Sequence, residues 1–182
     1  MRTLCIFCGS SSGNDPAYSA VARHVGAFLA SSDIALVYGG GRVGLMGSLA
    51  DAVLEAGGRV IGVIPQMLID KEVGHAGLTE LHIVSTMTER KLLMGELSDA
   101  FVALPGGIGT MDELFEVWTW SQLDLHHKPC GALNHNGYYD SLIAFLDHAV
   151  QEGFLHRRHR AMFLVDSEVE TLVERLFAAS GA

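Results

Sequence analysis

Short apolar runs alternate with helical patterns along almost the whole chain. Strands that alternate with helices of about 10–15 residues form right-handed crossovers and a parallel sheet covered on both faces. The sequence therefore predicts an α/β fold: a single doubly wound, Rossmann-like domain over residues 1–182, with a mostly parallel sheet of about seven strands. The expected strands are Thr3–Cys8, Ala35–Tyr38, Val60–Ile64, His82–Val84, Phe101–Leu104, Gly131–Leu133 and Phe163–Val165, and the expected helices are Pro16–Ala30, Leu45–Ala56, Thr88–Leu97, Met111–Leu123, Tyr139–Gln151 and Glu168–Ala178.

The charge balance limits the partners of such a domain. The 182 residues include 12 Lys and Arg against 21 Asp and Glu, which gives a net charge of −9. This balance argues against binding of nucleic acid through a broad basic face, because phosphate neutralisation needs clustered cations. No apolar run approaches the roughly 18 residues that cross a bilayer, and the N-terminus does not have a signal-peptide pattern, so we expect no membrane partner and a cytoplasmic location.

The three cysteines, Cys5, Cys8 and Cys130, are an odd number, which disfavours a disulfide framework. Residues i and i+3 of a strand face opposite sides of a sheet, so the sulfurs of Cys5 and Cys8 should not meet. We expect buried structural cysteines. No second Cys or His pair has the spacing of zinc ligands, so no metal site is expected.

The chain contains 21 glycines, and two glycine-rich loops each follow a strand and open a helix. In the first loop, Gly39, Gly41 and Gly44 satisfy the G-x-G-x-x-G pattern of dinucleotide-binding folds. The next strand ends in Ile64-Pro65-Gln66, without the acidic residue that would bind a ribose hydroxyl. A loop that only permits close packing of helix and strand is therefore an equal alternative.

The second loop, Pro105-Gly106-Gly107-Ile108-Gly109-Thr110, precedes a long helix. Free backbone N–H groups and the helix dipole make such a loop a seat for a phosphate monoester. It is not a Walker loop, because no Lys-Ser/Thr follows the glycines. Thr110-Met111-Asp112-Glu113 also reads as a capping box, which by spacing alone favours a structural task for Glu113.

Arg90 and Lys91 fall in the first turns of another helix at the carboxyl edge of the predicted sheet. Positive charges are unfavourable near the N-terminus of a helix because of the helix dipole, so the helix itself does not explain why two cations stand there. A bound anion would supply that reason, and we favour this over a solvated pair beside Glu89.

With these motifs the chain resembles the Lonely guy family of nucleoside 5′-monophosphate phosphoribohydrolases, which activate cytokinins and are often labelled lysine decarboxylase-like. The resemblance extends from Cys8-Gly9-Ser10 to about Phe154. Its most specific elements are P-G-G-x-G-T-x-x-E, here Pro105 to Glu113, and the Arg90-Lys91 pair. The stretch from Tyr38 to Gly47 looks like the other glycine loop of the family.

The resemblance implies hydrolysis of the N-glycosidic bond of a nucleoside 5′-monophosphate to a free base and ribose 5-phosphate. A non-catalytic nucleotide-binding or carrier module of the same fold is the alternative. The resemblance also implies a homodimer with sites at or near the subunit interface, and no cofactor. It implies Glu113 and Arg90 as the catalytic pair, and Glu72, Lys91, Gly107, Ile108, Gly109, Thr110, Met111, Asp112 and Thr119 as substrate-binding residues.

Two features bear on the details of that resemblance. Many members of the family have His where this chain has Thr88, which concerns the contacts near the nucleotide. The helix Met111–Leu123 is apolar around most of its circumference, since Phe115, Trp120 and Leu123 lie off its main stripe. Such a helix is covered either by a second subunit or by a surrounding core, and the sequence leaves both open.

The remaining polar groups point to little chemistry. A pyridoxal-dependent decarboxylase is disfavoured, because Lys71, Lys91 and Lys128 alone could form the Schiff base. His126, His127 and His135 are expected to face solvent, and the run His156–Arg160 is expected to form a solvated loop.

Overall fold

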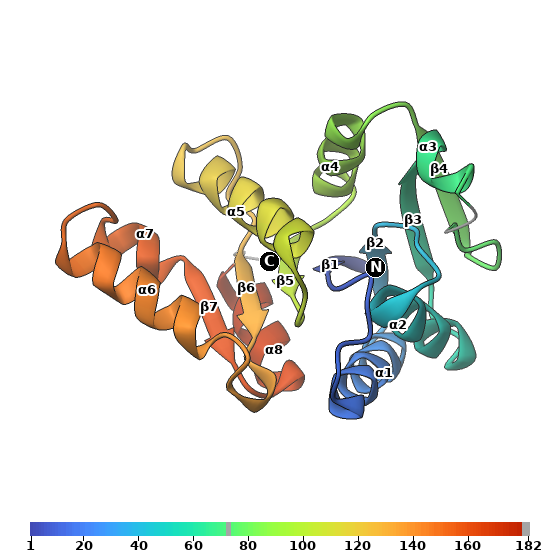
Figure 1. Cartoon of the computed structure of the whole chain (residues 1–182), viewed down its shortest axis with the longest axis horizontal. Coiled ribbons are helices and arrows are strands. Elements are labelled where there is room, and N and C mark those ends of the chain that lie inside the picture. Colours follow the sequence, from blue (N-terminus) through green and yellow to red (C-terminus); the bar gives the residue numbers. More distant parts are fainter. Residues whose placement is uncertain (72–73, 180–182) are drawn as a thin grey trace.

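The computed structural model of the chain describes residues 1–71 and 74–179. Its centre is a seven-stranded sheet in the order β4-β3-β2-β1-β5-β6-β7, and every neighbouring pair is parallel (Figure 1). The expected α/β fold with a parallel sheet is thus confirmed. The strands are β1 (Arg2–Phe7), β2 (Ile34–Tyr38), β3 (Val60–Pro65), β4 (Glu80–Val84), β5 (Ala100–Ala103), β6 (Cys130–Leu133) and β7 (Phe163–Asp166).

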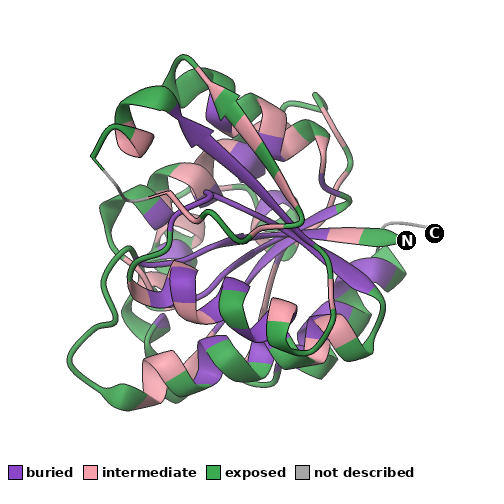
Figure 2. Ribbon diagram, turned by 90° about the vertical axis from the view of Figure 1, so that its right-hand side faces the viewer, coloured by how far each residue is buried: buried purple, intermediate pink, exposed green. Residues whose placement is uncertain are grey.

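Helices cover both faces of the sheet, and the inner strands lie buried between them, whereas the edge strands β4 and β7 are partly exposed (Figure 2). One face packs against α1 (Pro16–Ser31), α2 (Gly44–Glu55) and α8 (Val169–Ala179). The other packs against α4 (Met87–Glu96), α5 (Ile108–Gln122) and α6 (Asp140–Gln151). Short helical segments that the sequence did not indicate complete the fold: α3 (Gln66–Ile69), η1 (His135–Gly137) and α7 (Arg157–Ala161).

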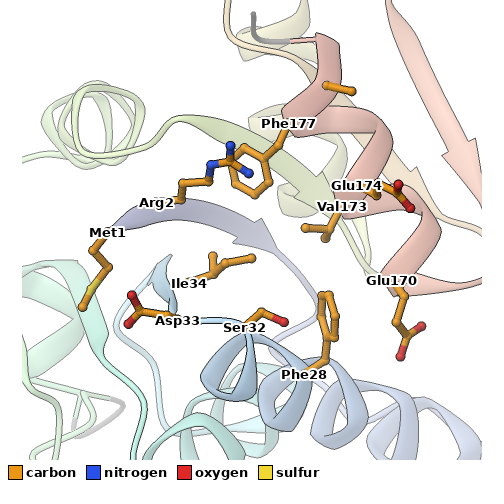
Figure 3. Close-up of a pocket in the computed structure, with 11 residues that line it drawn as sticks. Met1, Arg2, Phe28, Ser32, Asp33, Ile34, Glu170, Val173, Glu174 and Phe177 are labelled. Atoms are coloured by element: carbon orange, nitrogen blue, oxygen red, sulfur yellow. The ribbon is translucent and has the colours of Figure 1, made fainter. Parts of the chain in front are cut away.

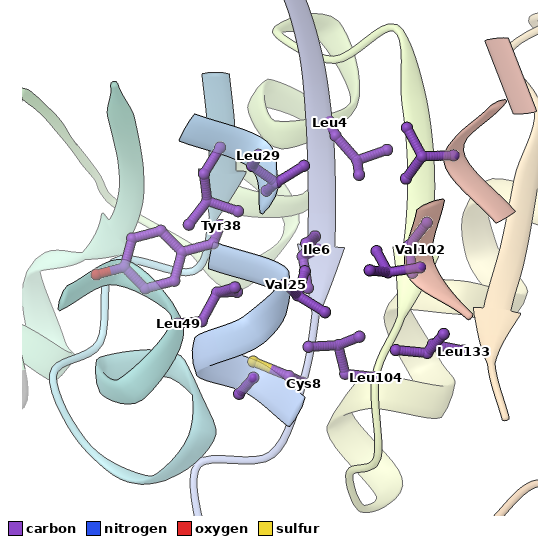
Figure 4. Close-up of a cluster of buried hydrophobic side chains, with 14 of the residues drawn as sticks. Leu4, Ile6, Cys8, Val25, Leu29, Tyr38, Leu49, Val102, Leu104 and Leu133 are labelled. Carbon is purple, nitrogen blue, oxygen red and sulfur yellow. The ribbon is translucent and has the colours of Figure 1, made fainter. Parts of the chain in front are cut away.

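Alternation along β1 divides the core into two clusters. Leu4, Ile6 and Cys8 belong to the cluster beneath α1 and α2 (Figure 4). Cys5 belongs to the cluster on the opposite face. The two sulfurs therefore lie on different sides of the sheet, and all three cysteines are free and buried, as the sequence predicted. Burial raises the pKa of the Cys130 thiol to about 12, so that it stays protonated and unreactive at neutral pH.

Two predicted helix boundaries have the expected local chemistry. The Asp15 carboxylate caps α1 by accepting a hydrogen bond of 2.8 Å from the Ala17 N–H, and Pro16 occupies the first helical position. Gly57 follows the end of α2 with φ of +77°, a left-handed conformation that glycine adopts without strain.

The start of α5 differs from the prediction. The helix begins at Ile108 rather than Met111, with Gly107 as its N-cap residue and no side-chain cap. Thr110 therefore lies inside the first turn, and the capping-box interpretation of Glu113 is wrong. The sequence did not indicate this start, because glycine disfavours helices and the whole run Gly106–Gly109 therefore looked like a loop. Its second half, Ile108 and Gly109, is in fact the first part of the helix.

Two expectations about exposed groups are wrong in part: His127, His156, Arg157 and Arg158 are exposed as expected, but His126 and His159 are not. Most of the His156–Arg160 run forms α7, where His159 is buried and its carbonyl accepts a hydrogen bond from Trp118 Nε1. His126 is half-buried, with its ring centroid 5.6 Å from that of Phe101, and burial lowers its pKa. In both cases an aromatic partner distant in sequence provides the cover.

Helix α5 is not enclosed by the chain's own core. Leu114, Val117 and Trp118 are buried, whereas Ile108 is 90% and Leu123 is 60% exposed. The alternative of a fully buried core helix is therefore excluded. Within the described residues, the helices are also too short or too polar to cross a membrane.

Candidate active site

The strand order places a crevice between β1 and β5. The chain builds outward from β1 to β4 and then returns to the other side of β1 with β5, so the connections after these two strands leave in opposite directions. In open α/β sheets ligands bind at the carboxyl ends of the strands at such a switch point. A cavity of about 250 Å³ lies there, lined by Ile6, Phe7, Cys8, Gly9, Ser10, Gly39, Met46, Met87, Arg90, Gly107, Ile108, Gly109, Thr110, Asp112 and Glu113.

Arg90, on α4, is buried in this cavity and its guanidinium is only partly bonded. Nη2 donates a hydrogen bond of 3.1 Å to the carbonyl oxygen of Gly39. A Cβ atom on Gly39 would lie 1.6 Å from that same nitrogen, so this position must be glycine for Arg90 to fit. The Nε atom is buried without a hydrogen-bond partner, and a buried donor of this kind marks a place where a ligand can bind.

The first glycine loop therefore serves packing, which was one of the two alternatives from the sequence. Gly39 makes room for Arg90, and Gly44, at φ of +62°, lies against the backbone of Ser10. The loop after β1 is tied to the same helix start, because the Leu45 N–H donates to the Gly9 carbonyl. These contacts hold the floor of the cavity in place.

Glu113, on α5, faces Arg90 across the cavity. Its Oε1 lies 3.8 Å from Arg90 Nη2, and the two side chains are only 12% and 9% exposed. Burial raises the pKa of the Glu113 carboxyl, and the positive charge of Arg90 opposes that rise. The result is a carboxylate poised near a cation without a direct hydrogen bond to it.

The N-terminus of α5 forms the third wall. A Cβ atom on Gly107 or Gly109 would meet nothing within 4 Å, so both glycines border open space rather than protein. The first N–H groups of a helix have no partner within the helix, and the dipole there favours an anion. This wall can hold a phosphate group.

Lys91, next to Arg90, has a different environment. Its Nζ pairs with Asp112 at 3.1 Å and with Glu116 at 2.8 Å, which links α4 to α5. The hydrogen bond to Glu116 is the main cause of a raised Lys91 pKa. These carboxylates supply a local reason for a cation that the sequence did not reveal.

A pyridoxal-dependent decarboxylase would need a lysine in the cavity to form the Schiff base, and none of the three lysines of the chain lines it. Lys91 is paired with carboxylates, Lys128 donates to the Gly95 carbonyl at 2.8 Å, and Lys71 is exposed. No lysine is thus placed to react with a ligand beside Arg90 and Glu113.

The structure brings together most of the predicted site residues. Arg90, Asp112, Glu113 and the run 107–110 line one cavity, whereas Lys91, Met111 and Thr119 do not. Glu72 lies outside the described residues. Sequence reasoning missed Gly9, Ser10, Met46 and Met87 as lining residues. They could have been predicted from their positions, because each follows closely after a strand or a glycine loop at the carboxyl edge of the sheet.

A larger cavity, of about 660 Å³, lies elsewhere, between β1, α1 and α8 (Figure 3). Three carboxylates line it, from Asp33, Glu170 and Glu174, and its one guanidinium, from Arg2, stacks 4.7 Å from the centre of the Phe177 ring. This lining repels anions, so its greater volume does not make it a phosphate-binding site. In the part of the chain that the structure describes, no three His, Cys, Asp or Glu residues are grouped to hold a metal ion.

Comparison with known proteins identifies close relatives. The chain is 49% identical over 170 residues to a cytokinin riboside 5′-monophosphate phosphoribohydrolase of Rhodococcoides fascians, covering 93% of this chain and 86% of that protein. It is 47% identical over 175 residues to the enzyme of that name, LOG1, from Arabidopsis thaliana, covering 96% and 82%.

Solved structures share the fold at lower identity. A molybdenum cofactor binding protein from Rippkaea orientalis superposes with a TM-score of 0.73 at 20% identity, covering 97% of this chain and 96% of that one. A Moco carrier protein from Chlamydomonas reinhardtii gives 0.71 at 18% identity, covering 97% and 98%. The family model described as "Possible lysine decarboxylase" matches residues 46–176. The chain belongs to this family, and within it to the Lonely guy group that the resemblance indicated.

Proposed function

We propose that this protein hydrolyses the N-glycosidic bond of a nucleoside 5′-monophosphate, releasing the free base and ribose 5-phosphate. The observation that carries the proposal is the buried, incompletely bonded pair of Arg90 and Glu113, which faces the open N-terminus of α5 across one cavity. The relatives' printed name, cytokinin riboside 5′-monophosphate phosphoribohydrolase, describes the same reaction class.

The phosphate acts as the handle that positions the sugar. Its oxygens accept hydrogen bonds from the N–H groups of residues 107–110, and Gly107 and Gly109 leave the space that it occupies. Interactions with a group remote from the reacting bond orient the substrate and lower the barrier of the step that follows.

Cleavage of the glycosidic bond passes through a transition state with positive charge on the sugar ring. In its ionised form the Glu113 carboxylate stabilises that charge and orients the attacking water as a general base. The positive charge of Arg90 lowers the pKa of Glu113 and so opposes the rise that burial causes, and its unpartnered Nε is available to the substrate. Asp112 is engaged by Lys91, so we give it no part in proton transfer.

The base that leaves is adenine, either plain or carrying a cytokinin side chain. The relatives are named for cytokinin ribosides, and adenosine monophosphate contains the same ring without the side chain. Comparing kcat/KM on plain and isopentenylated adenosine monophosphate measures this preference. Thr88, where many relatives have His, is the position to exchange if the preference differs from theirs.

Incubation of the purified protein with adenosine monophosphate tests the reaction. Chromatography should show adenine and ribose 5-phosphate appearing in equal amounts, in proportion to enzyme. Nucleotide that stays bound and intact would instead support the alternative of a non-catalytic carrier, since one fold can carry several unrelated functions.

We also propose that the chain acts as a homodimer with the site near the interface. Several apolar side chains on and around α4 and α5 are exposed, among them Leu92, Ile108, Leu123 and Leu125. Thr119 is exposed on α5 and lies outside the cavity of its own chain, so it would reach the partner's site. Sedimentation equilibrium should give twice the chain mass of 19.5 kDa, and Leu123→Glu should shift it toward a single chain.

A further inference from the structure

Three successive carbonyl groups behind the phosphate-binding loop are held by hydrogen bonds. The Leu104 oxygen accepts from the Tyr139 hydroxyl at 2.6 Å, and the Pro105 oxygen accepts from the Gly9 N–H at 3.1 Å. The Gly106 oxygen accepts from the Tyr138 hydroxyl at 2.6 Å. None of the three donors belongs to α5, the helix that follows the loop.

A turn of unusual backbone conformation delivers the two tyrosines. Asn136 and Gly137 both have positive φ, of 52° and 71°. The side chain of Asn134 closes the turn by accepting from the Tyr139 N–H at 2.7 Å and donating to Asp140 at 2.8 Å. The ring of Tyr138 is further held by Tyr18, edge to face with centroids 5.6 Å apart. The hydroxyl of Tyr138 is therefore fixed in position.

A hydrogen bond that fixes a carbonyl group also fixes the N–H of the next residue, where that residue has one. In a planar trans peptide the C=O of one residue and the N–H of the next point in opposite directions. The bond from Tyr138 to the Gly106 carbonyl therefore turns the Gly107 N–H away from Tyr138. Gly107 separates two hollows: one is lined by Tyr18 and Tyr138, and the other contains Arg90 and Glu113.

The bond from Tyr139 has no such consequence. It holds the carbonyl of Leu104, and the next residue is Pro105, which has no N–H. Two neighbouring tyrosines thus make bonds of equal length to the same loop, but only one of these bonds orients a donor at the phosphate site.

We propose that Tyr138 is a positioning residue for phosphate recognition: its hydroxyl fixes the peptide between Gly106 and Gly107 so that the Gly107 N–H donates to the substrate phosphate. The inference rests on the phosphate site of the proposed function. Tyr138 is 40% exposed, so water can satisfy the Gly106 carbonyl when the hydroxyl is removed, and the loop can then turn that peptide.

The test compares Tyr138→Phe with Tyr139→Phe by calorimetric binding of ribose 5-phosphate, a ligand that the enzyme does not hydrolyse. Loss of one well-oriented hydrogen bond to a charged group should weaken binding by Tyr138→Phe about five- to tenfold, and Tyr139→Phe should bind like the unmodified protein. In kinetics with adenosine monophosphate, Tyr138→Phe should raise KM by that factor and leave kcat within about twofold, because the N–H groups of residues 108–110 still orient the bound phosphate.

Unchanged binding by Tyr138→Phe overturns the proposal, and so does an equal loss in both variants, which would mean general loosening of the loop. If Tyr139→Phe does not fold, Tyr18→Phe replaces it, since Tyr18 touches Tyr138 and makes none of the three carbonyl bonds. Absence of any binding by the unmodified protein contradicts the phosphate site and with it the role of Tyr138. Binding without base release contradicts only the hydrolase function, so the two failures are distinguishable.

Discussion

Arg90 and Lys91 are neighbours on α4, and both face carboxylates of α5, yet their pairings differ. Lys91 makes short ion pairs, of 3.1 Å to Asp112 and 2.8 Å to Glu116. Arg90 is more deeply buried, lies 3.8 Å from Glu113 and keeps a buried Nε without a partner. The pairing that links the two helices is at short ion-pair distance, while the pairing in the cavity is longer and leaves Arg90 Nε without a partner.

This difference separates a structural pair from a reactive one. Burying a guanidinium and a carboxylate is costly, and incomplete hydrogen bonding leaves that cost uncompensated within the protein itself. Perturbed, incompletely paired charges of this kind gather at functional sites. We therefore propose that the substrate completes the hydrogen bonding of Arg90 and Glu113, whereas Lys91 is already paired with Asp112 and Glu116.

Among the substitutions that distinguish Arg90 from Lys91, replacement of Arg90 should cause the largest loss of kcat/KM. Arg90→Gln removes the charge that faces Glu113 and should lower kcat/KM for base release about 100-fold or more. Arg90→Lys should recover only part of the loss, because one ammonium cannot supply both the Nη2 that lies near Gly39 and Glu113 and the Nε that is left without a partner in the cavity. Thermal unfolding of each variant controls for folding, and a rate near that of the unmodified protein would contradict the role of Arg90.

Gly109→Ala tests the third wall and should have an effect of about tenfold on KM for the nucleotide, since the new methyl group occupies the space left for phosphate. The protein itself should tolerate the change. A Cβ there meets nothing within 4 Å, and alanine is favoured over glycine in a helix by up to about 1 kcal/mol. Weaker binding together with an equal or higher Tm is the expected result. Unaltered KM would place the phosphate elsewhere.

The pH dependence of kcat/KM tests whether Arg90 acts on the pKa of Glu113. Burial raises the pKa of Glu113, so base release should decline on acidification at a higher pH than an ordinary glutamate would give. Arg90 lowers that pKa, so the acid limb of kcat/KM should move to still higher pH in Arg90→Gln. Rates measured across pH for both proteins give this shift directly. An acid limb that stays in place would mean that Glu113 is not the titrating group.

Lys91→Gln should have the smallest effect. It breaks the partly buried link to Asp112 and Glu116, and pairs near the surface contribute about 1 kcal/mol or less to stability. We expect a lower Tm and a change in kcat/KM of only a few-fold, through slight displacement of α4. A loss as large as that of Arg90→Gln would show that Lys91 contacts the substrate, as the family resemblance implied.

The sequence predicted the elements and the site motifs for identifiable reasons. All seven strands and the six long helices are regular, strongly patterned segments, and their parallel order follows from the alternation itself. Parallel strands present all their carboxyl ends at one edge, so Arg90, Glu113 and the α5 loop had to lie along that edge, and α4, which connects β4 to β5, brings Arg90 beside Glu113.

What the sequence could not provide are pairings between distant segments. Lys91 seemed to need an anion until α5 supplied Asp112 and Glu116, and Thr110 seemed a cap until the helix began at Ile108. Gly39 looked like part of a dinucleotide loop, and its actual task is to admit the guanidinium of Arg90. The Lys91 and Gly39 cases depend on contacts between segments that are distant in the sequence, which spacing along the chain does not encode, whereas the start of α5 is local and was obscured by its glycines.

The most direct test of the contrast between the two pairs is base release from adenosine monophosphate by Glu113→Gln beside Glu116→Gln. Both remove one negative charge from α5 with little change of shape, one beside Arg90 and the other beside Lys91. We predict that Glu113→Gln still binds the nucleotide and loses base release by about 1,000-fold, while Glu116→Gln keeps most of its rate. Normal release of adenine by Glu113→Gln, or equal losses in both variants, would contradict the assignment of Glu113 as the catalytic carboxylate.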